Sequence, residues 1–373
     1  MKKRKLILPI LFSAVIILTA LFTLVMPPKN YSENEKRMLA DFPEFTWENI
    51  ASGNFGDEFE KYLSDHLAGR DLFVGINAYF DMIMGRNSLG DIYNAKDGYL
   101  INAPKTNPED TFVKNMNNIE SFTVTHDLDA TLMIIPSAGY IMEDKLPAFH
   151  GKYRDGELFK KACELTPSVR FFDTRSHLAD SYAEGVQVYY KTDHHITSEG
   201  SYALYKEYCD LVGASYPEKD EYIVERYDGF RGTTYSGNGY FLNGSDTLEI
   251  WDSGLEVNVT LEEKDSKKTD KLFYREHLHN MDMYPVYLDG NHSYVHIENP
   301  RGKSGNLLVI RDSYAQNLAP FLAYNYKNIY MLDMRYYRNN MKVFLEDKNI
   351  DSVLYVYGID TLITDESTSW LLF

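Results

Sequence analysis

The longest hydrophobic stretch of the sequence lies at its N-terminus. Residues 6–26 carry no charged side chain and follow the basic residues Lys2-Lys3-Arg4-Lys5. About 20 apolar residues are enough for a helix to cross a bilayer, and a basic flank stays on the cytoplasmic side. We therefore expect a retained transmembrane anchor over residues 6–26, with everything after it outside the membrane. A cleaved signal peptide is the alternative, but the run is long for one and no small-x-small cleavage site follows it.

A helical pattern of hydrophobic positions comes next. Residues 29–54 are polar and contain Pro43, and we interpret them as a linker. From Phe55 to Met84, apolar residues recur every three or four positions, as they do along one face of a helix. The pattern is interrupted near Gly69, which predicts two helices with a break between them. Four polar residues at the break indicate an ion-paired helix junction: Asp65, His66, Arg70 and Asp71.

Beyond a short hairpin over 91–100, strand-like and helix-like segments alternate. The largely apolar runs are typical of buried parallel strands, and repeated βα units imply a parallel sheet covered by helices on both faces. The predicted strands are 130–136, 169–173, 185–190, 306–311, 328–333 and 351–358, and the predicted helices are 108–125, 159–165, 198–212, 314–326 and 337–348.

Residues 221–300 interrupt this alternation. Seven glycines punctuate short segments there, and in 255–261 the apolar and polar residues strictly alternate. A period of two is the signature of a half-buried strand. We therefore predict a glycine-rich β insertion at 221–300 inside one α/β domain over 55–373, preceded by the anchor region 1–28 and the linker 29–54.

Charge and composition exclude some classes of function. The chain has 38 Lys+Arg against 55 Asp+Glu, a net charge of −17. Nucleic-acid binding depends on neutralising phosphates with basic side chains, so this class is excluded. The 30 tyrosines fit a carbohydrate-binding surface or a well-packed core. Cys163 and Cys209 show no CxxC or metal-ligand spacing. We expect no metal and no cofactor.

The candidate chemistry lies at the ends of two predicted strands. Asp193 stands two residues before His195, and Ser313 follows the apolar run 306–311. A serine becomes a nucleophile when a histidine takes its proton, and a carboxylate holds that histidine in the correct tautomer. Reactive loops of parallel sheets lie at the carboxyl ends of the strands, so these three residues can meet. We predict a catalytic triad of Ser313, His195 and Asp193.

Two alternative interpretations concern the same motif. Asp193-His194-His195 superficially matches a motif of metal-dependent phosphoesterases. The metals of those enzymes need further acidic clusters, and the only such cluster in this sequence is Asp127-x-Asp129, in a predicted loop. We therefore favour the serine mechanism. If the segment is extended, His194 points away from His195 and has a structural role.

These residues resemble the SGNH-like acyltransferases of the AlgX/AlgJ group, and most closely the DHHW family of Gram-positive bacteria. That family carries Asp-x-His-Trp and, much later, a serine at a strand end, which correspond here to Asp193, His195 and Ser313. The family's tryptophan is Ile196 in this chain. The resemblance also includes Ser32–Arg37, Asp65 with Arg70-Asp71, Ile135–Ser137, Phe230–Thr233, Leu288–His292 and Asp312–Tyr314.

The resemblance implies an SGNH-like three-layer α/β/α fold with a mostly parallel sheet. It implies O-acetylation of an exopolysaccharide or cell-wall glycan, outside the membrane of a Gram-positive-type bacterium. A membrane-bound O-acyltransferase usually supplies the acetyl group. A carbohydrate acetylesterase with the same triad, and a non-catalytic scaffold of a polysaccharide-export complex, are the alternatives.

The resemblance also suggests roles for residues around the triad. Asp312 corresponds to the acid before the SGNH serine and orders the loop. Gly290 and Asn291 match the pair that donates hydrogen bonds to the oxyanion, although a plain turn is the alternative. Arg311, at the strand end, is expected either to hold an anionic group or to form a surface ion pair.

Overall fold

The computed structural model describes residues 2–32, 34–106, 109–236, 238–262 and 266–373. The chain forms two compact units. The smaller unit contains residues 1–90 together with 235–242, and the larger one contains residues 91–234 and 243–373.

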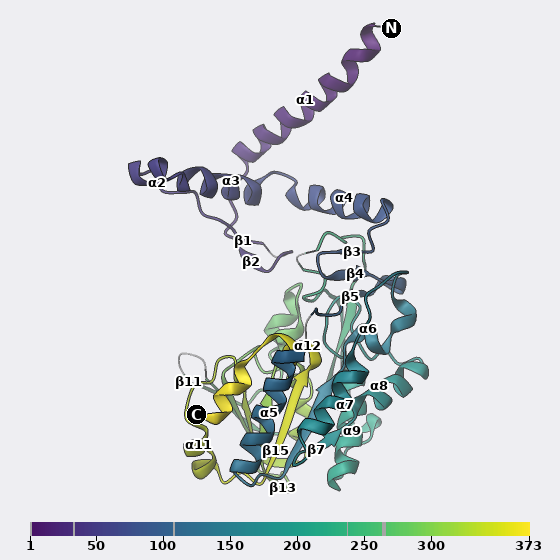
Figure 1. Ribbon diagram of the computed structural model, residues 1–373, viewed down its shortest axis with the longest axis vertical. Coiled ribbons are helices and arrows are strands. Elements are labelled where there is room, and N and C mark those ends of the chain that lie inside the picture. The colour runs from purple at the N-terminus through teal and green to yellow at the C-terminus, as the bar shows by residue number, and fades with distance from the viewer. Residues whose placement is uncertain (1, 33, 107–108, 237, 263–265) are drawn as a thin grey trace. The chain divides into compact units, whose positions relative to one another are not determined.

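The smaller unit is mainly helical (Figure 1). Its elements are α1 (Lys2–Val25), α2 (Trp47–Ser52), α3 (Asn54–His66), α4 (Arg70–Ile83) and a hairpin of β1 (Tyr31–Ser32) and β2 (Arg37–Met38). The stretch Ile7–Val25 of α1 is long and apolar enough to cross a membrane. The predicted helix break is confirmed, because Gly69 precedes α4 with a φ of 74° in the left-handed region that glycine tolerates best.

The junction between α3 and α4 is ion-paired, as the sequence predicted. The buried Asp65 carboxylate accepts hydrogen bonds from both terminal nitrogens of Arg37, at 2.9 and 2.5 Å, and Arg70 pairs with Glu35 at 2.5 Å. The hydrogen bonds from Arg37 hold the pKa of Asp65 below its ordinary value. The motif Ser32–Arg37 therefore has a structural role, since it supplies both partners of this junction.

The larger unit is built around an eight-stranded sheet with the strand order β11-β10-β12-β14-β13-β15-β6-β7. The five strands from β14 to β7 are parallel, and β10, β11 and β12 extend the sheet in antiparallel fashion. The strands are β6 (Ala130–Ile135), β7 (Arg170–Phe172), β10 (Asn258–Glu262), β11 (Ser266–Thr269), β12 (Tyr294–Glu298), β13 (Ser304–Arg311), β14 (Tyr326–Leu332) and β15 (Ser352–Gly358).

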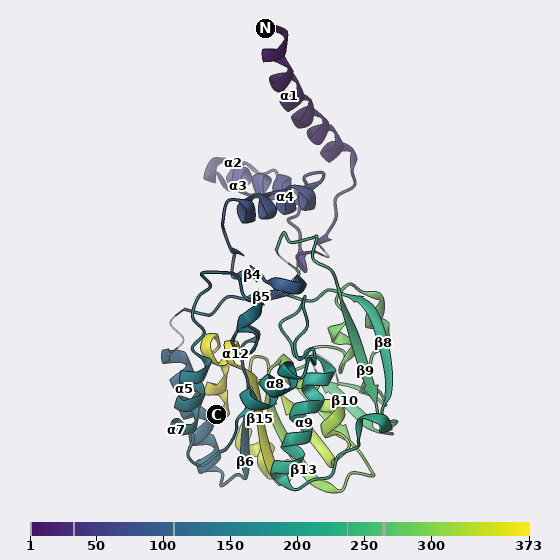
Figure 2. The same cartoon turned by 90° about the vertical axis from the view of Figure 1, so that its right-hand side faces the viewer.

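Helices cover both faces of this sheet (Figures 1 and 2). Side chains alternate along β13, so Leu308 and Ile310 pack in one hydrophobic cluster and Leu307 and Val309 in the other. The first cluster contains residues of α5 (Glu109–Thr125), α7 (Asp155–Leu165), α11 (Met341–Lys348) and α12 (Ile359–Thr364). The second contains residues of α8 (Thr174–Ala183), α9 (Ser198–Val212) and α10 (Ala319–Leu322). The predicted three-layer α/β/α fold is confirmed.

Several predicted elements have the expected bounds. The hairpin at 91–100 consists of β4 (Ile92–Asn94), a 3-10 turn and β5 (Leu100–Asn102), and β3 (Ser88–Leu89) precedes it in the sequence. Helix α9 begins after Thr197, whose hydroxyl accepts a hydrogen bond from the N–H of Gly200, as expected for an N-cap. The alternation in 255–261 is confirmed by the buried Val259 and Leu261 of β10.

Other predicted elements are wrong. Residues 185–190 form no strand: Val188, Tyr189 and Tyr190 are buried, but Tyr189 makes only a single antiparallel bridge, with Ile196. Helix α8 was not predicted. The helix expected at 314–326 is reduced to the 3-10 turn Ser313–Ala315 and the short α10, because Pro320 has no N–H with which to continue a preceding helix.

The segment 221–300 is rich in strands, but they lie in two sheets. Strands β8 (Ile223–Phe230) and β9 (Asp246–Asp252) form a separate two-stranded ribbon, whereas β10, β11 and β12 are part of the central sheet. The ribbon and the loops around it deliver residues to the site described next.

Candidate active site

Ser313 lies where the central strand β13 ends. Asp312 caps the short 3-10 turn that begins at Ser313, because its carboxylate accepts a hydrogen bond from the N–H of Tyr314 at 3.0 Å. The same carboxylate accepts one from the N–H of Gly358 at 2.8 Å, at the end of the adjacent strand β15. Burial raises the pKa of Asp312, which these N–H donors counteract. Asp312 thus ties the serine turn to the neighbouring strand, in agreement with its predicted ordering role.

Asp193 and His195 lie in a tight loop between Val188 and Thr197. The loop is closed by backbone hydrogen bonds from Tyr190 N–H to the His195 carbonyl and from Thr197 N–H to the Val188 carbonyl. Within it, Oδ1 of Asp193 accepts hydrogen bonds from the backbone N–H of His195 at 2.9 Å and from its Nδ1 at 2.5 Å. The Asp-x-His motif therefore orients its own imidazole.

The structure brings the three predicted residues together. Nε2 of His195 lies 2.8 Å from Oγ of Ser313, so a continuous hydrogen-bonded chain runs from Asp193 through His195 to Ser313. Asp193 and His195 are buried, and Ser313 is partly exposed. This order and these distances are what a serine nucleophile, its base and an orienting carboxylate require.

The second oxygen of Asp193 is held by a loop that follows β8. Oδ2 accepts hydrogen bonds from the backbone N–H of Thr233 at 2.6 Å and from its hydroxyl at 2.8 Å. Gly232 packs so tightly on Asp193 that a Cβ there would lie 2.1 Å from Oδ2. Burial alone would raise the pKa of Asp193, but the histidines and these hydrogen bonds lower it, so the carboxylate stays ionised. Sequence reasoning had not assigned these positions a role in holding Asp193.

Two further side chains hold the ring of His195. Tyr284 stacks on it with ring centres 3.8 Å apart and planes at 9°, and its hydroxyl donates a hydrogen bond to the Ser313 carbonyl at 3.0 Å. His194 lies 3.9 Å from the His195 ring, with Nδ1 2.6 Å from the Thr233 hydroxyl. The prediction that His194 points away is wrong, because the loop bends at these residues and is not extended. Tyr284 carries no sequence signal, since its segment was predicted only as insertion.

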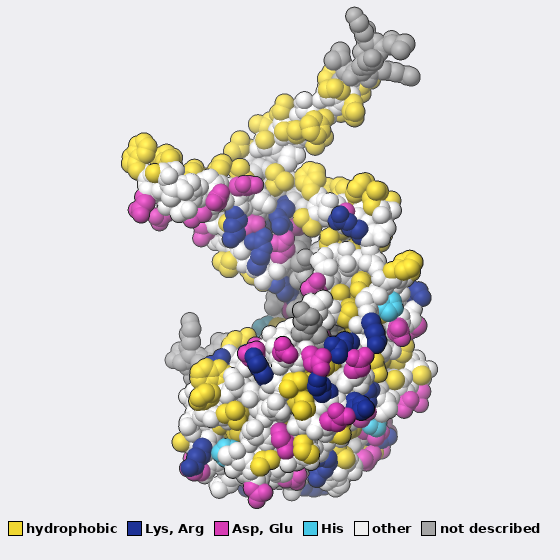
Figure 3. Space-filling view, viewed as in Figure 1, with side chains coloured by type: hydrophobic (Ala, Val, Ile, Leu, Met, Phe, Trp, Pro, Cys, Tyr) yellow, Lys and Arg dark blue, Asp and Glu magenta, His cyan; other side chains and the backbone are white. Residues whose placement is uncertain are grey.

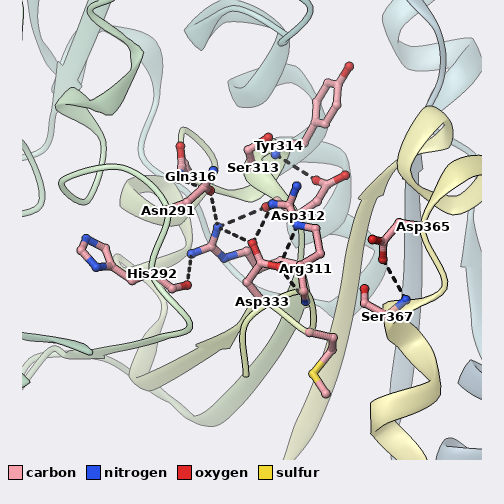
Figure 4. A network of polar contacts seen from close by, with 12 residues as sticks. Asn291, His292, Arg311, Asp312, Ser313, Tyr314, Gln316, Asp333, Asp365 and Ser367 are labelled. Atoms are coloured by element: carbon pink, nitrogen blue, oxygen red, sulfur yellow. Dashed lines mark hydrogen bonds and ion pairs between the residues drawn. The ribbon is translucent and has the colours of Figure 1, made fainter. Parts of the chain in front are cut away.

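Asn291 lies in a second loop beside the serine turn (Figure 4). Its side-chain oxygen accepts hydrogen bonds from Arg311 at 3.1 Å and from Gln316 at 2.8 Å, which come from either side of Ser313 in the sequence. Two donors to the oxygen orient the exposed amide so that its NH2 group is turned away from them. Gly290 has a φ of 88° and completes the turn that presents Asn291. The arrangement suits an oxyanion donor.

Arg311 is fully buried and forms no surface ion pair. Besides Asn291, it donates a hydrogen bond to the His292 carbonyl at 3.1 Å and lies 3.7 Å from the carboxylate of Asp333. Burial lowers the pKa of Arg311, and the charge of Asp333 opposes this effect. Arg311 therefore orients the loop of Asn291, and neither predicted role, as a holder of an exposed anionic group or as a surface pair, fits its burial.

The residues considered for a metal site do not form the constellation that phosphoesterases need. One ligand atom from each of Asp193, His194 and His195 lies within 4.8 Å of the others. Both oxygens of Asp193 and both ring nitrogens of His195 are, however, already hydrogen-bonded within the triad and its loop. Asp127 and Asp129 precede β6 and therefore lie at the amino end of that strand, whereas the site lies at the carboxyl ends.

The fold and these contacts define a class of protein: α/β/α proteins with a serine, a histidine and an aspartate in hydrogen-bond contact at one edge of the sheet. Residues 174–332 match the family model described as DHHW protein. The predicted resemblance to this family is therefore confirmed over that segment, which includes Asp193, His195 and Ser313.

Solved structures with TM-scores above 0.6 show the same fold. A DHHW family protein from Eubacterium siraeum is 19% identical, with a TM-score of 0.64, over 75% of this chain and 93% of its own. Bacillus cereus PatB1 is 21% identical, with a TM-score of 0.62, over 73% and 97%, and a second PatB1 structure contains a sulfonyl adduct. The O-acetyltransferase domain of Pseudomonas putida AlgJ is 14% identical, with a TM-score of 0.46, over 74% and 92%. No curated protein matches the sequence significantly.

The position of the missing family tryptophan is buried. Ile196 is 1% exposed and packs in the core, so close to Gly200 that a Cβ added there would lie 3.4 Å from the Cβ of Ile196. Its carbonyl accepts a hydrogen bond from Asn317 at 2.7 Å. The residue after His195 is thus part of the packing beneath the site in this chain.

Proposed function

We propose that this protein is a membrane-anchored, extracytoplasmic serine O-acetyltransferase that modifies an exopolysaccharide or a cell-wall glycan. The observation that carries the proposal is the hydrogen-bonded chain Asp193–His195–Ser313 at the end of the central strand. The confirmed family resemblance and the apolar helix α1 support the glycan acceptor and the membrane location.

In the first half-reaction, His195 takes the proton of the Ser313 hydroxyl as its oxygen attacks the carbonyl carbon of an acetyl ester. The tetrahedral oxyanion that forms accepts a hydrogen bond from the Asn291 amide, which Arg311 and Gln316 orient. His195 then returns the proton to the leaving oxygen, and acetyl-Ser313 remains. Asp193 stabilises the imidazolium throughout, because its ionised carboxylate contacts Nδ1.

In the second half-reaction, His195 deprotonates a sugar hydroxyl, whose oxygen attacks the carbonyl carbon of acetyl-Ser313. The bond to Oγ of Ser313 then breaks, and His195 returns the proton to Oγ as the sugar keeps the acetyl group. A membrane-bound O-acyltransferase is the proposed source of the acetyl ester. If water replaces the sugar hydroxyl, the same residues make an acetylesterase. The scaffold alternative depended on the missing tryptophan, and the buried position of Ile196 removes that support.

The test is intact-mass analysis of the full-length protein in detergent after brief exposure to 4-nitrophenyl acetate. We expect one acetyl group on Ser313 of the unaltered protein and none on Ser313→Ala or His195→Ala. Ser369→Ala, at a serine outside the site, should be acetylated normally. Since PatB1 accepts a sulfonyl adduct, phenylmethylsulfonyl fluoride should also modify Ser313 and block acetylation. Labelling that persists in Ser313→Ala would refute the proposal.

A second experiment separates the transferase from the esterase. Acetyl-Ser313 is formed first, and a neutral oligosaccharide is then added. A transferase yields acetylated sugar and loses its acetyl group faster as the sugar concentration rises, whereas an esterase yields acetate at a rate independent of the sugar.

A further inference from the structure

Helix α4 of the smaller unit has two apolar faces, and only one of them is used inside the protein. Gly75 and Ala78 are buried against the segment 235–242: a Cβ on Gly75 would collide with the ring of Phe241, and Gly239 packs on Ala78. The other face consists of side chains that are 42–78% exposed, namely Phe73, Ile76, Phe80 and Ile83. Their spacing of three and four residues places them on one side of the helix.

Exposed apolar residues continue beyond α4. Trp47 at the start of α2 is 84% exposed, and Phe45 just before it is also exposed. Figure 3 shows hydrophobic side chains gathered over α2 and α4. A soluble protein rarely leaves so many large apolar side chains in water without a partner that covers them.

Two hydrogen bonds connect these helices to the end of the membrane-spanning segment. The N–H of Ala68, in the α3–α4 junction, donates to the hydroxyl of Thr23 at 2.9 Å, in the last turn of α1. Nε2 of His66 lies 3.1 Å from the carbonyl of Lys29, just beyond α1. If α1 crosses the bilayer, as proposed above, the α3–α4 junction lies at the extracytoplasmic surface of that bilayer.

We propose that the exposed face of α4 rests in the outer leaflet of the bilayer that α1 crosses, at the boundary between head groups and acyl chains. Helix α4 begins at the junction and is about 21 Å long at 1.5 Å per residue, so its whole length is within reach of that boundary. Its face of aromatic and aliphatic side chains is that of an interfacial helix, and Trp47 is of the type that membrane interfaces favour. The exposed Asp57, Glu58 and Glu60 of α3 would repel anionic lipid head groups, so the contact depends on apolar burial.

The test places an environment-sensitive NBD fluorophore on single cysteines of the full-length protein in phosphatidylcholine vesicles. The exposed Cys163 is first replaced by serine, and the buried Cys209 is kept. Ile76→Cys reports on the proposed face, and Ser64→Cys, on the polar face of α3, is the matched control. Leu18→Cys in α1 reports whether the anchor itself is inserted.

We expect the label at position 76 to emit at shorter wavelength, to be quenched by doxyl-labelled lipids and to resist aqueous iodide, whereas the label at 64 shows the reverse. If the label at position 76 is as accessible to iodide as the label at 64, while the label at 18 is quenched by lipid, the inference is wrong although α1 is inserted in the membrane. A label at position 76 that resists iodide but is not quenched by lipid, together with excimer emission from a pyrene label at the same position, would overturn the inference. It would show that a second copy of the chain covers this face. The readout does not depend on acetyl transfer, so it can fail independently of the proposed function.

Discussion

Replacement of Gly232 by alanine tests whether the loop after β8 controls the orientation of the triad. A Cβ at this position would lie 2.1 Å from Oδ2 and 2.5 Å from Cγ of Asp193. Ordinary contact begins near 3.4 Å, so the carboxylate or the loop must move by about 1.3 Å. The hydrogen bond from His195 Nδ1 to Asp193 is 2.5 Å long, and a shift of this size away from the ring would lengthen it to about 3.8 Å, beyond hydrogen-bond distance. If the loop moves instead, Asp193 loses the two hydrogen bonds from Thr233.

The expected loss of activity follows from the role of the carboxylate. Complete loss of the orienting aspartate in serine hydrolases lowers kcat about 10⁴-fold. A displaced but present Asp193 should cost less, so we expect kcat to fall about 10²- to 10³-fold, or about 2.7–4.1 kcal/mol of transition-state stabilisation. KM should change little, because Gly232 does not provide a binding surface for the ester. Overpacking should also lower the free energy of unfolding by about 1–3 kcal/mol.

The assay is steady-state hydrolysis of 4-nitrophenyl acetate by the full-length protein in detergent, with thermal melting to show that the variants are folded. Gly244→Ala is the matched control, because a Cβ at this nearby glycine meets no atom within 4 Å. If Gly232→Ala is folded and as active as Gly244→Ala, the loop does not hold Asp193 and our account of the site is wrong.

Three further predictions concern other parts of the larger unit. Asn291→Ala should lower kcat about 10²- to 10³-fold with little change in KM, measured with the same ester, if the amide is an oxyanion donor. Tyr284→Leu should lower kcat, and Tyr284→Phe, which keeps the stack on His195, should restore most of it. Burial raises the pKa of Asp360 to about 6, so the folded protein retains a proton that the unfolded chain releases, and stability falls as pH rises from about 4 to 6. Asp360→Asn should remove this loss. Urea unfolding should then show a free energy of unfolding that is higher than that of the unaltered protein by about 1–3 kcal/mol at pH 7.5 and by much less at pH 4.5.

The central sheet was predictable because its strands are buried on both faces. In β13 and β15 nearly every side chain is covered by a helical layer, so each strand is a continuous apolar run bounded by polar residues. The same signal failed at 185–190, where burial comes from packing of the loop itself and not from pairing with neighbouring strands. Apolar runs report burial, and burial is shared by strands and by well-packed loops.

Short helices were poorly predicted for a related reason. Helix α8 has no clear hydrophobic face, since only Thr174 and Leu178 are buried in it. The segment after Ser313 is apolar and mostly buried, which suggests a long helix, but Pro320 restarts the backbone and side chains replace helical hydrogen bonds. Asn317, for example, donates to the Ile196 carbonyl from within this segment. Such contacts involve residues far apart in the sequence and leave no periodic pattern.

In the candidate site, too, the residues with contacts close in sequence were predicted and those with distant contacts were not. Asp193 and His195 are two residues apart, and the carboxylate binds both the backbone N–H and the ring of the histidine, so the geometry of the pair is contained in the motif itself. Ser313 was found because a parallel sheet brings the carboxyl ends of its strands to one edge.

The residues that complete the site come from loops that only tertiary structure brings near. Thr233 and Tyr284 lie 38 and 89 residues beyond His195, in a segment predicted only as a glycine-rich β insertion, and they hold Asp193 and His195 from two sides. A sequence motif thus points to the groups that react, because each position of a proton relay needs a side chain with a particular donor or acceptor atom, and few residue types supply it. The groups that hold them in place need only supply a hydrogen bond or a flat ring, which many residue types can do. A sequence therefore points to the chemistry of such a site more readily than to the contacts that make it rigid.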